Sequence, residues 1–232
     1  MNTRNPNLPL LESVAHALGV LRNRLVFVGG CASGLLLTDS AAPAARVTQD
    51  VDAIVDVTSL AEYHRLELQL QQAGFKHDRS PDAPICRWIG GGGVLDVMPT
   101  DERVLGFGNR WYAEAVLRAG EFRLPNGLQI RLISSPLFLA TKLEAFSGRG
   151  GSDFRASHDL EDIVALLDGR PELVAEVSTA SGELRSYLSS QVAGLLNDFR
   201  FMEAISGHVP GDEASQARVS LVVARLRQLA TI

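Results

Sequence analysis

The sequence has little of several residue types that would identify common classes of protein. Only 6% of its residues are aromatic, so the sequence does not indicate an aromatic surface on which nucleic-acid bases would stack. Its two cysteines, Cys31 and Cys86, lack the spacing of a metal site and are too few for a disulfide framework. Cys31 follows a pair of glycines without an evident base partner, and we interpret it as a small packing residue.

The chain also lacks an excess of positive charge and a long apolar stretch. Its net charge of −5 argues against a uniformly basic nucleic-acid-binding protein, although a local basic patch is compatible with it. No stretch approaches the ~20 apolar residues of a membrane-spanning helix. Because residues 1–9 are polar and show no apolar targeting segment, we expect a reduced, cytoplasmic protein without a membrane partner.

The pattern of apolar residues predicts an α+β fold followed by helices. Hydrophobic residues make up 46% of 232, which is sufficient for a sizeable core. Strands are predicted at 25–28, 50–57, 75–78, 85–89, 94–98, 121–124 and 128–132, and helices at 8–22, 31–38, 58–73 and 109–119. Only helices are predicted after residue 134, including 137–146, 157–167, 172–177, 182–206 and 213–230. We therefore expect a mixed-sheet domain at 1–133 and a helical domain at 134–232.

A glycine turn after the first predicted strand is the first candidate site. Gly29 and Gly30 follow the apolar run 25–28 and precede a short predicted helix. A strand, a glycine turn and a helix start present free backbone N–H groups, which suit a phosphate. Glycine also lets a ligand approach the backbone closely, and Ser33 could add a hydroxyl.

Acidic residues on predicted strands form the second candidate site. Asp50 and Asp52 are two residues apart, so they point to the same face of a strand. Their like charges favour a hard cation between them, such as Mg²⁺. Asp96 is an acid in an otherwise apolar strand, and such a residue is either solvent-facing or functional. Thr48 faces the same side as Asp50 if the strand extends back that far.

These blocks, in their order, resemble the nucleotidyltransferase superfamily, and most closely its AbiEii-like and MenT-like toxin members. Residues 46–52, from Arg46 to Asp52, match the block R-[LVI]-[ST]-x-D-[IVL]-D. A downstream block, K-x-x-A…R…D-x-x-D-[IL], is matched by Lys142, Ala145, Arg149, Asp159, Asp162 and Ile163. The resemblance covers about residues 25–167.

The resemblance implies a polymerase beta-like fold and transfer of a nucleoside monophosphate from an NTP to a hydroxyl. It implies that Asp50, Asp52 and Asp96 bind Mg²⁺ or Mn²⁺, with Asp96 as second-metal ligand or base. Nucleotide contacts are implied for Gly29, Gly30, Ser33, Arg46, Thr48, Lys142 and Arg149. Catalytic roles are implied for Asp50, Asp52, Asp96, Lys142 and Asp159, with Asp159 holding Lys142 or Arg149. Thr48 is also a possible target of self-modification.

The acceptor and the biological role are open at this stage. The resemblance implies RNA, with a tRNA 3′ end as acceptor, and a toxin paired with an antitoxin protein. A protein or small-molecule acceptor would use the same residues, and a non-catalytic NTP-binding protein on this scaffold is the alternative of a different class.

Two further features have an ordinary alternative. Asp159 and Asp162 are also compatible with a stabilising surface pair at a helix N-terminus. Lys142 is also compatible with an ordinary solvated side chain. His158-Asp159 matches the core of an HD-type phosphohydrolase, but no other histidine has supporting context. The four glycines at 90–93 are interpreted as a tight hairpin rather than a phosphate loop, since no Lys-Ser/Thr follows.

Overall fold

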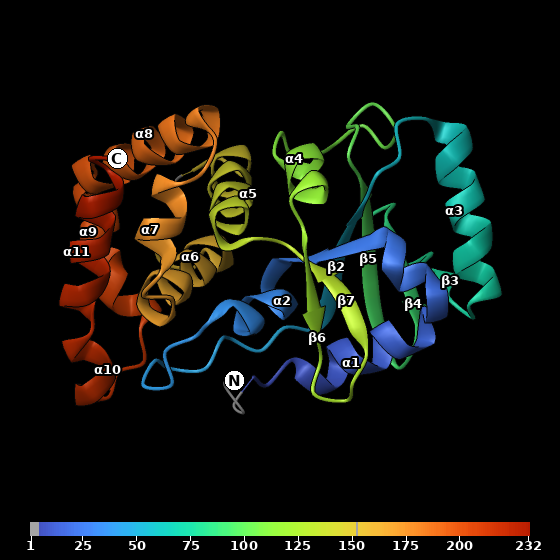
Figure 1. Ribbon diagram of the computed structural model, residues 1–232, viewed down its shortest axis with the longest axis horizontal. Helices are drawn as coiled ribbons and strands as arrows, with labels where there is room; N and C mark the ends of the chain where they lie inside the picture. Colours follow the sequence, from blue (N-terminus) through green and yellow to red (C-terminus); the bar gives the residue numbers. More distant parts are fainter. Residues whose placement is uncertain (1–4, 152) are drawn as a thin grey trace. The chain divides into compact units, whose positions relative to one another are not determined.

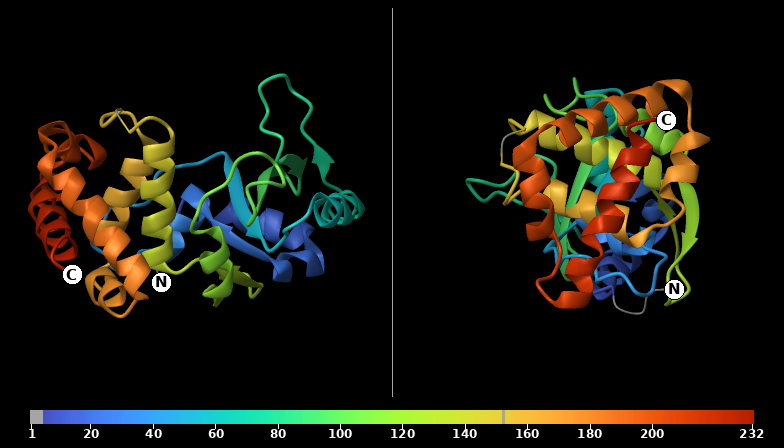
Figure 2. Two further views of the ribbon diagram at one scale, coloured as in Figure 1. Left: turned by 90° about the horizontal axis from the view of Figure 1, so that it is seen from above. Right: turned by 90° about the vertical axis from the view of Figure 1, so that its left-hand side faces the viewer.

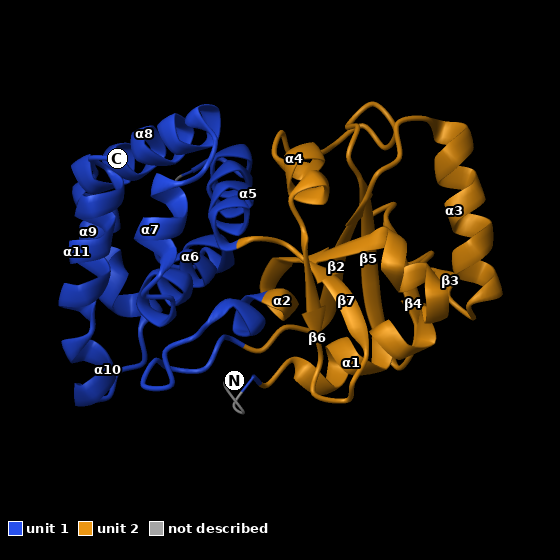
Figure 3. Ribbon diagram, viewed as in Figure 1, with its two compact units in different colours: residues 1–5, 33–46, 135–232 blue, residues 6–32, 47–134 orange. Residues whose placement is uncertain are grey.

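A computed structural model describes residues 5–151 and 153–232 of the chain. Two compact units divide it (Figure 3). Unit 2 comprises residues 6–32 and 47–134, and unit 1 comprises Asn5, residues 33–46 and the described part of 135–232. The segment 33–46, which the sequence places between two elements of the first predicted domain, is thus grouped with the C-terminal helices.

Unit 2 is built on one seven-stranded sheet (Figure 1). Its strand order is β3-β4-β5-β2-β1-β7-β6. The strands are β1 (Leu25–Val28), β2 (Asp50–Val55), β3 (Lys76–His77), β4 (Arg87–Gly90), β5 (Gly93–Pro99), β6 (Gly120–Arg123) and β7 (Gln129–Leu132). The connection between β3 and β4 projects away from the sheet (Figure 2). All seven strands correspond to strands predicted from the sequence, with β3 shorter than expected.

The sheet is mixed, as predicted. β2 pairs with β5 and β1 with β7 in parallel, whereas the other neighbours are antiparallel. The central strands β1 and β2 carry the buried apolar residues, with Phe27 and Ile54 fully inaccessible to solvent. A strand buried on both faces reads as a continuous apolar run, which explains why residues 25–28 were recognised easily. The α+β fold class is therefore confirmed.

Four helical segments cover the sheet of unit 2. They are α1 (Leu8–Ala17), the 3₁₀ helix η1 (Gly19–Arg24), α3 (Leu60–Gln72) and α4 (Tyr112–Leu117). Ser59 caps α3 by accepting a hydrogen bond from the Glu62 N–H, and Tyr63 anchors this helix by donating to the Val97 carbonyl at 3.0 Å. The helix expected at 8–22 is divided because Gly19, with a φ of 56°, begins a 3₁₀ turn.

A turn of two glycines fixes the register of the hairpin between β4 and β5. Gly91 and Gly92 have φ angles of 62° and 77° and join β4 to β5, so that Gly90 pairs with Gly93. Positive φ at both central residues is the geometry of a type I′ turn, which glycine adopts without steric cost. Residues 90–93 therefore form the predicted tight hairpin and not a phosphate loop.

Unit 1 is helical. It contains the second half of α2 (Gly29–Leu36), which begins in unit 2, and then α5 (Ser135–Gly148), α6 (His158–Gly169), α7 (Leu173–Ser178), α8 (Gly182–Asn197), α9 (Phe199–Ala204), the 3₁₀ helix η2 (Ile205–His208), α10 (Glu213–Ala217) and α11 (Val219–Leu229). The first half of α5 is fully buried. Ser157 caps α6 as predicted, with its hydroxyl accepting from the Leu160 N–H. No described helix has the length and apolar character needed to cross a membrane.

Two helices predicted as continuous are interrupted. The expected helix 182–206 stops at Asn197, because Asp198 is extended and caps a new helix by accepting from the Arg200 N–H. The expected helix 213–230 is split at Arg218, where α10 ends. Aspartate at such a boundary competes for backbone hydrogen bonds and favours a cap over a helix interior.

Arg218 connects segment 33–46 to the C-terminal helices. Its guanidinium bonds to Asp168 Oδ1 at 2.7 Å and to Asp39 Oδ2 at 2.6 Å. The hydrogen bond from Arg218 lowers the pKa of Asp39, whereas burial raises the pKa of Asp168. The N–H groups of Thr38 and Asp39 also donate to the Gly169 carbonyl. Segment 33–46 is therefore held by both backbone and ionic contacts.

Candidate functional site

The glycine turn at the end of β1 requires glycine at its first position. Gly29 has a φ of 66°, and a Cβ at this position would collide with the carboxylate of Asp52. The sequence predicts that this helix begins at Cys31, whereas α2 begins at Gly29 itself. The close approach of the turn to Asp52 follows directly from the absence of a side chain on Gly29.

Asn7 holds this turn to the segment that precedes β2. Its side-chain oxygen accepts from the Thr48 N–H at 2.9 Å, its Nδ2 donates to the Gly30 carbonyl at 3.5 Å, and its own carbonyl accepts from Cys31 Sγ at 3.7 Å. Asn7 is almost fully buried. Sequence reasoning missed Asn7, because no local pattern connects it with residues 23 or 41 positions away.

The predicted acids of unit 2 lie together on the sheet. Asp52 in β2 pairs in register with Val28 of β1 on one side and with Asp96 of β5 on the other. Directly paired residues project from the same face of a sheet, and Asp50 shares this face because it is two residues before Asp52. The structure therefore brings Asp50, Asp52 and Asp96 to one face, at the end of the sheet where the glycine turn lies.

A fourth residue, Arg87 of β4, completes this row. It pairs in register with Asp96. Its Nε lies 2.9 Å from Asp96 Oδ1 and its Nη2 lies 2.7 Å from Asp96 Oδ2, while Nη2 also reaches Asp50 Oδ2 at 3.2 Å. We call Asp50, Asp52, Asp96 and Arg87 the sheet cluster. The hydrogen bond to Asp96 raises the pKa of Arg87, so its guanidinium stays charged.

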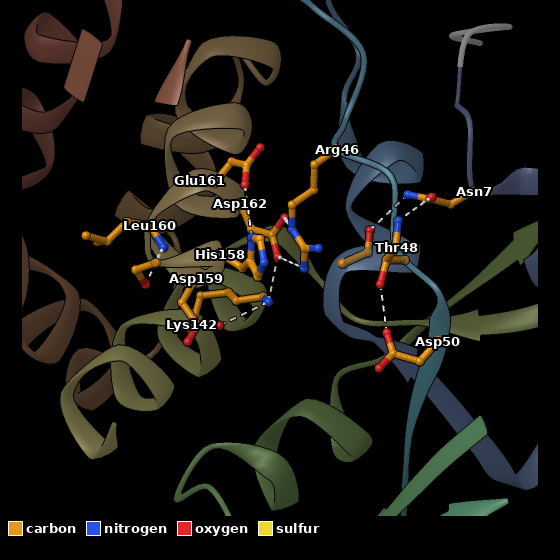
Figure 4. Close-up of polar contacts among 12 residues, drawn as sticks. Asn7, Arg46, Thr48, Asp50, Lys142, His158, Asp159, Leu160, Glu161 and Asp162 are labelled. Carbon is orange, nitrogen blue, oxygen red and sulfur yellow. Dashed lines mark hydrogen bonds and ion pairs between the residues drawn. The ribbon is translucent and has the colours of Figure 1, made fainter. Parts of the chain in front are cut away.

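Arg87 was missed from the sequence, although a signal for it exists. The two-residue turn at Gly91 and Gly92 fixes the pairing of the hairpin, which places residue 87 opposite residue 96. Thr48, in contrast, behaves as the sequence suggested: its hydroxyl donates to Asp50 Oδ1 at 2.7 Å although it precedes the strand (Figure 4).

The donor chemistry of the sheet cluster fits a divalent cation. Three carboxylates supply the hard oxygen ligands that Mg²⁺ and Mn²⁺ prefer. Within residues 5–151 and 153–232, no three acidic, histidine or cysteine side chains are gathered closely enough to hold a metal as they stand. In the sheet cluster a cation of the chain, the Arg87 guanidinium, already contacts two of the three acids.

Cys31 is not a nucleophile in this environment. Burial, with a smaller effect of Asp52 and Asp50, raises the pKa of its thiol to about 12. A thiol of that pKa remains protonated at neutral pH and is inert as a nucleophile. The interpretation of Cys31 as a packing residue agrees with its full burial.

The residues of the second sequence block form a separate group in unit 1. We call Arg46, Lys142, Arg149, Asp159 and Asp162 the helical cluster. Lys142 Nζ lies 3.2 Å from Asp159 Oδ1 and 2.6 Å from Asp162 Oδ2 (Figure 4). Arg46 donates to both oxygens of Asp162, at 2.9 and 3.3 Å. Arg149 donates to Asp159 Oδ2, so Asp159 contacts both of the cations that the resemblance had offered as its partners.

Burial excludes the ordinary interpretation of these acids as a surface pair. The side chains of Asp159 and Asp162 are 4% and 1% exposed, and Lys142 is 11% exposed. Buried carboxylates require charged partners, and both have them here. Lys142 is accordingly an internal ion-pair residue, and the idea of a solvated lysine is wrong.

Arg149 differs from its neighbours in the helical cluster. Its side chain is 73% exposed, and it lines a cavity of about 300 Å³. The wall of this cavity also includes Phe146, Asp159 and residues of the loop after α5. An exposed guanidinium at a cavity wall is suited to contact an anion. Ser33, by contrast, is buried within α2.

His158 does not support a phosphohydrolase of the HD type. Its ring contacts Glu161 at 3.2 Å and is 72% exposed, while the neighbouring Asp159 is engaged by Lys142 and Arg149. Among the residues that the structure describes, this pair is not accompanied by the gathered histidine and aspartate ligands that such an enzyme needs.

Comparison with known proteins gives only distant structural similarities. No family model and no curated protein matches the sequence. The chain is similar to the antibiotic-resistance factor ANT(2'')-Ia (16% identity, TM-score 0.45, 84% of this chain and 97% of that one). It is also similar to JHP933 from Helicobacter pylori (11%, 0.49, 97% and 92%). A third similarity is to a proposed nucleotidyltransferase from H. pylori (10%, 0.47, 98% and 96%). At these identities and scores, the function of this chain must be inferred from its own residues.

Proposed function

We propose that this protein is a metal-dependent nucleotidyltransferase that moves a nucleoside monophosphate from an NTP to a hydroxyl group. The observation that carries this proposal is the row of Asp52 and Asp96 across adjacent strands, with Asp50 on the same face and the Gly29 turn against Asp52. Carboxylates that can hold metal ions, beside a glycine turn that can bind phosphate, are the groups that metal-assisted phosphoryl transfer requires.

In the proposed reaction the acceptor oxygen bonds to the α-phosphorus of the NTP, and the bond from that phosphorus to the β-phosphate oxygen breaks. Pyrophosphate leaves with the electron pair of the broken bond. Asp96 either takes the proton of the acceptor hydroxyl as the base, or contributes to a second cation site while a water molecule takes that proton. Asp50, Asp52 and Asp96 would hold Mg²⁺ or Mn²⁺, which when bound neutralises the phosphate charge.

The other residues of unit 2 have positioning roles in this proposal. The N–H groups at the start of α2 would donate to phosphate oxygens, since the glycines at positions 29 and 30 leave the backbone accessible. Thr48 orients Asp50 through its 2.7 Å hydrogen bond, and Asn7 keeps the turn and Thr48 together.

In unit 1, we propose that Arg149 contacts an anion, either a nucleotide phosphate or the RNA backbone. It is the exposed cation of the helical cluster, whereas Lys142 and Arg46 are largely enclosed with Asp159 and Asp162. Lys142 then acts by holding Asp159, which in turn positions Arg149.

The finer proposal is that the acceptor is RNA, a tRNA 3′ end, and that the protein is a toxin with a cognate antitoxin. It is supported by the match of residues 46–52 and of the block from Lys142 to Ile163 to the AbiEii-like and MenT-like pattern. A toxin of this kind should arrest growth when expressed alone, and the substitution Asp52→Asn should abolish the arrest.

Label transfer from each of the four α-³²P NTPs tests the activity. The protein is incubated with Mg²⁺ and total RNA, beside Asp52→Asn and a matched control, Asp56→Asn, an exposed residue that directly follows β2. We expect label on a tRNA-sized band, reduced at least ~10²-fold by Asp52→Asn and unchanged by Asp56→Asn.

Other outcomes redirect or overturn the proposal. Label on protein or on a small molecule would keep the transferase and change the acceptor. Metal-dependent NTP binding without transfer to any acceptor would instead support the non-catalytic NTP-binding protein. An equal loss of label transfer in Asp52→Asn and Asp56→Asn would contradict the role assigned to Asp52.

A further inference from the structure

Arg87 lies where a bound cation would be expected in the sheet cluster. It makes a bidentate contact with Asp96 at 2.9 and 2.7 Å, and the same Nη2 reaches Asp50 at 3.2 Å. These two acids come from β5 and β2, so a single guanidinium bridges two of the three proposed metal ligands. A bidentate arginine–carboxylate contact is among the stronger ion pairs in proteins.

The contact uses the oxygen atoms that a metal ion would need. A carboxylate oxygen that accepts from a guanidinium offers fewer lone pairs to a divalent ion. A guanidinium beside a dication is also repelled by it. Metal uptake by Asp50 and Asp96 therefore competes directly with Arg87.

Arg87 has both a route of release and an alternative partner. Its side chain is 27% exposed and that of Asp50 is 32% exposed, so the contact is partly accessible to solvent. Planar guanidinium groups bind phosphate oxygens bidentately, much as they bind carboxylates. A triphosphate brought next to the cluster would thus accept the arginine that the metal displaces.

We propose that Arg87 is an internal counter-ion that competes with the divalent cation for Asp50 and Asp96, so that metal is taken up together with the nucleoside triphosphate. This inference rests on the proposed function, because it needs a triphosphate as the second ligand. Arg87 is on this view a positioning residue that sets the order of loading and offsets part of the negative charge of the metal-free cluster.

The inference is tested without any turnover by measuring the binding of Mn²⁺ alone. Titration calorimetry and the electron paramagnetic resonance signal of free Mn²⁺ both report this binding. The variants are Arg87→Gln and Arg87→Lys, with Arg103→Gln as matched control. Arg103 is also paired with a nearby aspartate, Asp101, but is 85% exposed. Circular dichroism verifies that each variant is folded.

We expect Arg87→Gln to bind Mn²⁺ about 10-fold or more tightly than the unaltered protein, in the range by which groups around a metal site change affinity. Arg87→Lys keeps the charge without the bidentate fork and should lie between the two. Arg103→Gln should bind as the unaltered protein does. A non-hydrolysable NTP analogue should reduce the difference in Mn²⁺ affinity between Arg87→Gln and the unaltered protein. Adding Asp96→Asn to Arg87→Gln should remove the gain in Mn²⁺ affinity.

Two results would overturn the inference. In the first, both variants, Arg87→Gln and Arg87→Lys, fold and bind Mn²⁺ with the same affinity as the unaltered protein. Arg87 would then only hold β4 and β5 together. The other is a gain that survives Asp96→Asn. If the protein transfers label but Arg87→Gln binds Mn²⁺ no more tightly, the proposed function stands and the counter-ion role of Arg87 is refuted. If Arg87→Gln binds Mn²⁺ more tightly but the protein transfers no label, the counter-ion role stands and the proposed transferase function is refuted.

Discussion

The sheet cluster of unit 2 and the helical cluster of unit 1 both combine aspartates with basic side chains, but they differ in balance and burial. The sheet cluster places three carboxylates against one arginine, and Asp50 and Arg87 are about one-third exposed. The helical cluster places two almost inaccessible carboxylates among Arg46, Lys142 and Arg149. An excess of negative charge that faces solvent can attract a cation, whereas a buried and neutralised group chiefly stabilises its surroundings.

The largest expected effect on stability comes from breaking the buried cluster with Asp162→Ala. This substitution leaves Arg46 and Lys142 without their shared carboxylate in a region where Asp162 is 1% exposed. Removing one partner of a buried ion pair costs about 3–5 kcal/mol. Urea unfolding measures this cost.

The control for this substitution is Glu114→Ala, which breaks an exposed i,i+4 pair with Arg118. Its expected cost is below ~1 kcal/mol. If Asp162→Ala and Glu114→Ala had similar effects, the helical cluster would not be the stabilising group described above.

An intermediate effect is expected from Gly29→Ala in the sheet cluster. A non-glycine residue in the left-handed region costs about 1–3 kcal/mol, and the added Cβ would also push the Asp52 carboxylate aside. We therefore expect lower stability in urea unfolding together with loss of Mn²⁺ binding and of label transfer.

Gly19→Ala separates the two causes. Gly19 has a similar φ of 56°, but open space surrounds the position of its missing Cβ. It should lose stability through backbone strain and keep Mn²⁺ binding. Retained metal binding in Gly29→Ala would show that the close approach of the turn to Asp52 is not required.

The smallest effect on stability is expected from Arg149→Ala. Its side chain is 73% exposed, and Asp159 keeps its contact with Lys142, so the cost should be below ~1 kcal/mol. If Arg149 contacts an anion, the same substitution should weaken NTP or RNA binding several-fold, measured by fluorescence titration. Arg200→Ala, which removes another exposed ion-paired arginine, should leave binding unchanged.

The sequence predicted the sheet and the position of its acids well, because strand patterns are local. The alternation of residues alone placed Asp50 and Asp52 on one face, and the glycine hairpin at 90–93 determined the partner of every residue in β4. Arg87 could have been recognised from this register. Helix boundaries were predicted less well: Asp198 and Arg218 end helices for which the apolar stripe simply continues.

The role of the helical cluster could not be judged from local pattern. Asp159 and Asp162 have the spacing of an ordinary solvated pair at a helix start, and their burial depends on residues far along the chain. Arg46 meets Asp162 across 116 positions, and the tie of Asn7 to Thr48 spans 41. Such contacts depend on how elements pack.

The sequence by itself determined the α+β class, the strands, the glycine turn and the set of acids, since dihedral preferences and side-chain alternation act over a few residues. Only the tertiary structure decided which charges meet: Arg87 bridging Asp50 and Asp96, and Asp162 enclosed by Arg46 and Lys142. The reason is physical, because the strength of an ion pair depends on distance and on exclusion of water, and both are set by packing between distant segments.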